Sequence, residues 1–127
     1  MEFTLKTRIP AKPSEVYSSW LNSETHSRMT GGEAEISAEI GASFTAWDGY
    51  IEGVNIELEP DKRIVQSWRT SEFEDNEEDS LVEILFEELN NNTELTLIHS
   101  NLSESGEHYK KGWEEHYFEP MIDYFKK

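Results

Sequence analysis

The alternation of apolar and polar residues through the middle of the chain constrains its fold more than any other feature. Between residues 33 and 100, apolar side chains recur at every second position, and turn-forming residues interrupt the pattern at regular intervals. A period of two is typical of a half-buried β-strand, because successive side chains point to opposite faces of a sheet. Asp48-Gly49 separates two such runs and predicts a tight hairpin turn, since glycine accepts a positive φ. The pattern therefore predicts an antiparallel meander.

The alternating runs define the expected strands. A first strand is expected where Phe3, Leu5, Thr7 and Ile9 alternate with polar residues. Six more strands are expected near residues 34–38, 42–48, 50–58, 63–71, 80–89 and 93–100.

Two other regions have helical spacing. Val16, Tyr17, Trp20 and Leu21 fall on one helical face, so one or two short helices are expected after the first strand. Residues 103–127 form the second region, which predicts a long helix.

The long helix carries an aromatic stripe. Tyr109, Trp113 and Tyr117 are spaced by four residues, and Met121 continues the series. Gly112 is unfavourable inside a helix, which suggests a close packing contact there. Pro120 removes one helical hydrogen bond and predicts a kink.

The order of these elements predicts an α+β fold in which a curved seven-stranded antiparallel sheet wraps around the long C-terminal helix. A sheet with one apolar face needs a cover, and only this helix is large enough to provide it. A pocket is expected between helix and sheet, since concave, mostly apolar spaces are the usual ligand sites.

Composition narrows the classes of function. The chain has 127 residues, which suits a single domain over residues 1–127, and its 27 acidic and 11 basic residues give a net charge of −16. Nucleic-acid binding and binding to anionic membranes are not expected, because both need clustered Lys and Arg. Without cysteine there are no disulfides or thiolate ligands. No apolar signal segment opens the chain and no apolar run could span a bilayer, so a cytoplasmic location is expected.

Four blocks of sequence resemble a known family. They are FTAWDGYIEG (44–53), LEPDKRIVQSWR (58–69), TELTLIH (93–99) and GWEEHYFEPMIDYF (112–125). They resemble the C-terminal-type domain of the activator of the heat-shock-protein-90 ATPase. That family is a branch of the START-like (SRPBCC) superfamily, whose helix-grip fold is also that of the birch-pollen allergen.

The resemblance implies two kinds of function. With the helix-grip fold, it implies first an interaction with a chaperone ATPase. Eukaryotic members join this domain to a separate N-terminal domain with a basic chaperone-binding motif, which has no counterpart in these residues. Other members of the superfamily bind lipophilic molecules or cyclise polyketides.

The candidate site residues are those expected to face the cavity between sheet and helix. They are Trp20, Phe44, Tyr50, Trp68, Leu97, His99, Trp113, Tyr117 and Met121. Large aromatic residues also dominate ordinary protein cores, so a purely structural role is the alternative for each. Strand parity predicts that Tyr50, Val54, Ile56 and Leu58 share one face of their strand.

His99 is a polar residue on the otherwise apolar face of Leu95 and Leu97. Such a histidine is more often a hydrogen-bonded core residue than a ligand contact. Its ring could still titrate near neutral pH and bind a polar atom of a ligand.

No metal site, cofactor or catalytic set is predicted. His26, His108 and His116 lack the spacing of a metal motif. The acidic run 72–79 lacks the glycine that an EF-hand loop needs at its sixth position, which favours a solvated loop. Carboxylates are so abundant that any two could be paired on paper. Only a perturbed pKa in a cleft would identify a catalytic acid and base among them.

Three functions remain open at this stage. The first is a small cytoplasmic START-like protein that holds a small hydrophobic ligand between sheet and helix. The second is a chaperone-interacting protein of the heat-shock-protein-90 ATPase activator type. The third is a cyclase- or dehydratase-like enzyme that uses the same cavity, which is weakest because no catalytic residues can be named.

Overall fold

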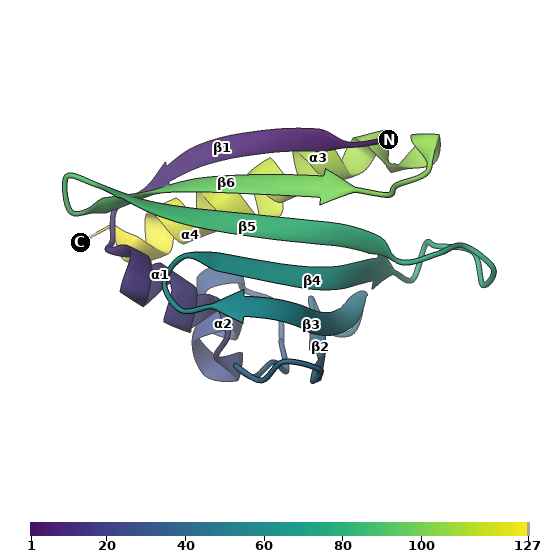
Figure 1. Cartoon of the computed structure of the whole chain (residues 1–127), viewed down its shortest axis with the longest axis horizontal. Helices are drawn as coiled ribbons and strands as arrows, with labels where there is room; N and C mark the ends of the chain where they lie inside the picture. The colour runs from purple at the N-terminus through teal and green to yellow at the C-terminus, as the bar shows by residue number, and fades with distance from the viewer. Residues whose placement is uncertain (127) are drawn as a thin grey trace.

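A curved antiparallel sheet with a long helical segment behind it makes up most of the computed structural model, which describes residues 1–126 (Figure 1). Lys127, the last residue of the predicted C-terminal helix, lies outside the described residues. Among these residues, no helix is both long and apolar enough to cross a membrane. In chain order the elements are β1 (Phe3–Ile9), α1 (Pro13–Trp20), α2 (Ser23–Thr30), β2 (Ser43–Ala46), β3 (Ile51–Glu59), β4 (Arg63–Thr70), β5 (Ser80–Leu89), β6 (Asn92–Ser100), the 3₁₀-helix η1 (Glu104–Glu107), α3 (His108–Trp113), the π-helical turn η2 (Glu114–Phe118) and α4 (Glu119–Phe125).

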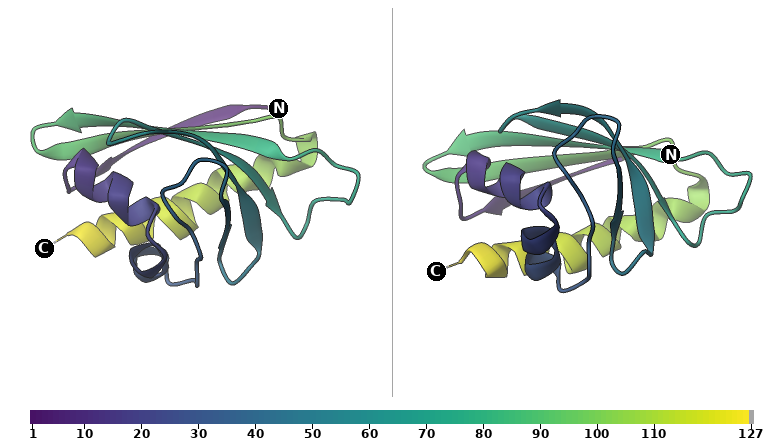
Figure 2. Two further views of the ribbon diagram at one scale, coloured as in Figure 1. Left: turned by 60° about the horizontal axis from the view of Figure 1, so that its bottom comes forward. Right: turned by 90° about the horizontal axis from the view of Figure 1, so that it is seen from below.

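The sheet follows the predicted meander. Its strand order is β1-β6-β5-β4-β3-β2, and every neighbouring pair is antiparallel. Helices α1 and α2 carry the chain from β1 at one edge to β2 at the other. Seen from below, the sheet bends over the helical segment that ends the chain (Figure 2). The predicted α+β helix-grip architecture is therefore confirmed.

The sheet has six strands, so the prediction of a seventh strand at residues 34–38 is wrong. Only Glu35 pairs with β2 there, through an isolated bridge to Thr45 with two N–O distances of 3.0 Å. Side chains bind the rest of this backbone: the Ser23 hydroxyl contacts both the N–H and the C=O of Ile36. The Asn55 amide donates to the carbonyls of Ser37 and Glu39. Since side chains satisfy these backbone groups, the segment needs no ladder.

The inner face of the sheet and the helical stripe form the core. Ile64, Trp68, Ile84 and Leu97 on the inner face are buried, as are Tyr109, Trp113, Tyr117 and Met121 of the C-terminal helical segment. Burial of apolar surface between the two layers is the main stabilising contribution that this arrangement provides.

Strand β3 departs from the predicted parity. A bulge between Asn55 and Glu57 shifts its register against β4. Val54 before the bulge and Ile56 within it are both exposed, whereas Leu58 after the bulge lies on the inner side opposite Ile64. The grouping of Tyr50, Val54, Ile56 and Leu58 on one face is therefore wrong, because a bulge adds one residue and interrupts the period of two.

The C-terminal helical segment is continuous from α3 through η2 to α4 (Figure 1). The kink near Pro120 stays a prediction. A π-helical turn at Glu114–Phe118 lies directly before the first turn of α4, which contains this proline. A π-helical turn accommodates an interruption of the regular α-helical ladder. The packing contact predicted at Gly112 is absent, since a Cβ atom there would meet nothing within 4 Å.

Candidate functional site

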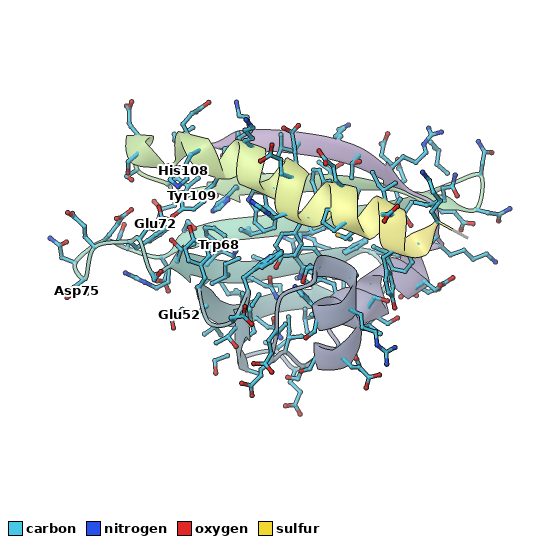
Figure 3. The ribbon with its side chains drawn as sticks, turned by 180° about the vertical axis from the view of Figure 1, so that it is seen from behind. Glu52, Trp68, Glu72, Asp75, His108 and Tyr109 are labelled. Atoms are coloured by element: carbon cyan, nitrogen blue, oxygen red, sulfur yellow. The ribbon has the colours of Figure 1, made fainter. Side chains whose placement is uncertain are left out.

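A cavity of about 470 Å³ lies between the sheet and the first turns of the C-terminal helical segment. Its walls come from the β2–β3 turn, the start of β3, the end of β4, α3 and η2. The lining residues are Trp47, Tyr50, Ile51, Trp68, His108, Tyr109, Lys111, Gly112, Trp113, Glu115, His116 and Tyr117. Figure 3 shows Trp68 and Tyr109 at this end of the molecule, with His108 beside the loop that carries Glu72.

Four of the nine candidate residues line this cavity. They are Tyr50, Trp68, Trp113 and Tyr117. The other five lie in the core away from the cavity walls: Trp20, Phe44, Leu97, His99 and Met121 are each no more than 5% exposed. The structure thus brings the sheet and helix aromatics together and leaves the remaining candidates as packing residues.

Trp68 is the centre of the aromatic wall. Its ring centroid lies 5.0 Å from that of Tyr109 in an edge-to-face arrangement and 5.6 Å from that of Trp113. Trp113 in turn lies 4.8 Å from Tyr117 along the helix. Such separations are those of favourable aromatic pairs. The wall is therefore a preformed apolar surface.

His99 lies behind this wall, in a series of hydrogen bonds that runs from Trp113 to the backbone of Trp68. The indole N–H of Trp113 donates to His99 Nδ1 at 3.0 Å, so the ring proton is on Nε2. Nε2 donates to the Ser80 hydroxyl at 2.8 Å, which donates to the carbonyl of Trp68 at 2.7 Å. Burial lowers the pKa of His99 to about 3. The ring is thus neutral at neutral pH, and both of its nitrogens have protein partners.

A second buried histidine joins the helical segment to α2. His26 Nδ1 donates to the carbonyl of Trp20 at 2.7 Å, and the Tyr117 hydroxyl donates to His26 Nε2 at 2.9 Å. Burial lowers the pKa of His26 and raises the pKa of Tyr117. The hydroxyl of Tyr117 is therefore engaged in the core, and the residue presents its ring to the cavity.

Polar contacts join several residues on one side of the cavity. The Tyr109 hydroxyl lies 2.6 Å from Thr70 Oγ1, and the Tyr50 hydroxyl donates to the carboxylate of Glu72. His108 Nε2 lies 3.3 Å from the same carboxylate. Burial raises the pKa of both tyrosines, so both hydroxyls are protonated at neutral pH. These contacts tie the β4–β5 loop to α3 at the cavity rim.

Sequence reasoning missed several lining residues. Tyr109 belongs to the same four-residue series as Trp113, so the helical period could have identified it. Trp47 is not among the nine candidates, and it sits in a turn with φ of 51°, where neither a strand nor a helix period indicates its direction. Its ring packs on Gly32, where a Cβ atom would lie 2.5 Å from Trp47 Cε3. The Trp47 indole nitrogen is buried and has no hydrogen-bond partner within residues 1–126.

Comparisons with known proteins agree with this architecture. The family model for "Activator of Hsp90 ATPase homolog 1-like protein" matches residues 10–126. The human activator of 90 kDa heat shock protein ATPase homolog 1 is 28% identical over 125 residues, which cover 98% of this chain and 37% of the human protein. The chain thus spans little more than a third of the length of that relative.

Solved structures show the same fold. An HSP90 activator from Plasmodium falciparum superposes with a TM-score of 0.85 at 23% identity, covering 94% of this chain and 91% of that one. CalU16 from Micromonospora echinospora superposes with a TM-score of 0.82 at 24% identity, covering 98% and 76%. Since the family model matches nearly the whole chain, the resemblance predicted from the sequence is confirmed, and the protein belongs to the activator of Hsp90 ATPase homolog 1-like family.

Proposed function

We propose that this protein acts on an Hsp90-type chaperone and regulates its ATPase. The observation that carries the proposal is the family match over residues 10–126, together with the alignment of 98% of the chain to the human ATPase activator. These comparisons favour the chaperone function, placed second in the sequence analysis, over the small-ligand function placed first. Because the alignment covers 37% of the human protein, activity of this domain on its own is part of the proposal.

The charge of the chain suits a protein partner with a basic surface. A net charge of −16 creates a field that attracts positively charged surfaces and raises association rates at low ionic strength. A cytoplasmic location is part of the same proposal, and the absence of cysteine fits a reducing compartment.

Steady-state ATP turnover tests the proposal directly. Adding the folded chain to the Hsp90 of the same organism is expected to raise ATP turnover in a saturable manner, because an activator must bind the chaperone and favour its hydrolytically competent state. A folded acidic protein of similar size and charge serves as the control for non-specific charge effects. Neither binding nor a change in turnover, at chain concentrations up to solubility, would contradict the proposal.

We propose ligand binding in the cavity as a second function. A space of about 470 Å³ falls within the usual size range of small-molecule sites, and six of its twelve lining residues are Trp or Tyr. Trp47 lines the cavity, and its buried indole nitrogen is a hydrogen-bond donor with no protein partner within residues 1–126. A small, largely apolar molecule with one hydrogen-bond acceptor is the ligand class that these groups favour.

Native mass spectrometry checks this second function. The gently purified protein is expected to retain a mass above its sequence mass, and denaturation is expected to release it. The released compound, added back, should raise the melting temperature, since a ligand that binds only the folded state stabilises it. A bare mass combined with no thermal shift across a panel of apolar compounds would count against the ligand proposal and leave the chaperone proposal intact.

A further inference from the structure

We infer that the protein docks its chaperone partner through the outer face of the sheet, on β3, β4, β5 and the adjoining β2 edge, and that the partner presents Lys or Arg side chains around an apolar one. The inference rests on the proposed chaperone function and names the surface that performs it. This face lies on the side of the sheet opposite the C-terminal helical segment and turns toward the viewer in Figure 1. The cavity lies on the other side of the sheet.

Apolar side chains are exposed together on this face. Val54, Ile56 and Leu81 are 37%, 40% and 40% exposed. Val54 and Leu81 flank Ser67, because the Val54 N–H donates to Ser67 Oγ at 2.9 Å and Ser67 pairs with Leu81 across β4 and β5. The β3 bulge places Ile56 beside them on the exposed side. Single exposed apolar residues are ordinary, and a group on neighbouring strands offers an apolar contact area to a partner.

A groove of about 460 Å³ adjoins this apolar group at the β2–β3–β4 corner. Val54 belongs to its lining, and so do three carboxylate residues, Glu35, Glu52 and Asp79. Among residues 1–126, Arg69 is the one cation in the lining. Glu52 projects from this corner in Figure 3.

Arg69 does not neutralise the groove. Its Nη1 lies 2.7 Å from Asp79 and 3.0 Å from the carbonyl of Glu77, and its Nη2 donates to the carbonyl of Glu74 at 2.9 Å. The guanidinium is therefore committed to the β4–β5 loop. Glu35 and Glu52 form no ion pair with any cation in residues 1–126, and both are exposed.

The other guanidinium on this face is likewise committed. Arg63 binds Glu57 and Glu83, each at 2.6 Å, and Glu59 at 3.4 Å. This network contains three carboxylates for one cation. The outer face thus combines exposed apolar side chains with an excess of carboxylates, which complements a basic partner surface built around an apolar anchor.

The charge excess also weighs against self-association as the use of this face. Two copies meeting through the same patch would bring Glu35 and Glu52 close to the equivalent carboxylates of the other copy. Like charges placed opposite each other cost several kcal/mol in an interface. A basic partner is therefore the occupant that the surface favours.

Charge reversal on this face tests the inference. The double variant Glu35→Lys/Glu52→Lys reverses the two unpaired carboxylates of the groove. The matched control, Glu114→Lys/Glu119→Lys, makes the same change in net charge on exposed positions of the C-terminal helical segment. Affinity of each 127-residue variant for the Hsp90 of the same organism is measured by isothermal titration calorimetry at 50 and 300 mM salt, with melting temperatures to confirm folding.

The groove variant is expected to bind at least about tenfold more weakly than the control at 50 mM salt, with a smaller loss of affinity on adding salt. Equal weakening in both variants would overturn the docking surface and keep the proposed function. Absence of binding by the wild type would overturn the proposed function and the docking surface with it. If the wild type is a dimer and the groove variant is a monomer, the face binds a second copy of the chain, which would also overturn the inference.

Discussion

Replacing Gly53 by alanine is expected to lower the free energy of unfolding by about 3 kcal/mol, which corresponds to a fall in melting temperature of roughly 10 °C. A Cβ atom at this position would lie 1.9 Å from the carbonyl oxygen of Ser67 and 2.8 Å from Phe44 Cε1. The nearer obstacle is backbone of β4, so β3 and β4 would have to separate where Val54 binds Ser67. Thermal and urea unfolding followed by circular dichroism measure the loss.

The same substitution at Gly112 provides a control of opposite sign. A Cβ atom there meets nothing within 4 Å, and the residue lies inside α3. Alanine is more favourable than glycine in a helix by about 0.5–1 kcal/mol, so Gly112→Ala should stabilise the protein slightly. Comparable stability of Gly53→Ala and the wild type would contradict the close approach of β3 and β4.

Acidification is expected to destabilise the protein through His99. Its pKa falls from the usual 6.5 to about 3 in the folded state because the ring is buried. Between these two values the unfolded chain binds a proton at this residue and the folded protein does not. Stability therefore decreases as the pH falls through this window, by about 1.4 kcal/mol per pH unit and about 5 kcal/mol in all. The pKa of buried His26 is also lowered, which adds an effect of the same sign.

The variant His99→Gln isolates this contribution. Glutamine retains a hydrogen-bond donor and an acceptor for Ser80 and Trp113, but it does not titrate. Urea unfolding at pH 7.5, 6, 5 and 4 is expected to show the wild type losing stability more steeply than the variant. Parallel curves for the two proteins would show that His99 takes up its proton equally in both states, contrary to the buried network.

Local patterns predicted most of the fold. The alternation in β1, β4, β5 and β6 and the four-residue series from Tyr109 to Met121 are each set by which face is buried, so the sequence shows them directly. Residues 34–38 have the same alternation, yet they form one bridge instead of a strand. The hydroxyl of Ser23 and the amide of Asn55 bind that backbone, and such long-range contacts leave no periodic signal.

The candidate site was predicted less completely, for similar reasons. Tyr50, Trp68, Trp113 and Tyr117 line the cavity, as their strand and helix positions suggested. The parity argument failed at Leu58, because the bulge between Asn55 and Glu57 reverses the facing of the residues that follow it. Trp47 lines the cavity from a turn, and its ring packs on Gly32. Turns obey no period, so only the folded structure reveals such a residue.

An NMR titration tests the central claim most directly, namely that this domain docks Hsp90 through the outer face of its sheet. Amide spectra of the ¹⁵N-labelled chain are recorded while unlabelled Hsp90 of the same organism is added. The account predicts early loss of intensity at Glu52, Val54 and Leu81 on the outer face, with later and weaker changes at Gly112 and Trp113 beside the cavity. Unchanged spectra at saturating Hsp90, or losses centred on the cavity residues, would contradict it.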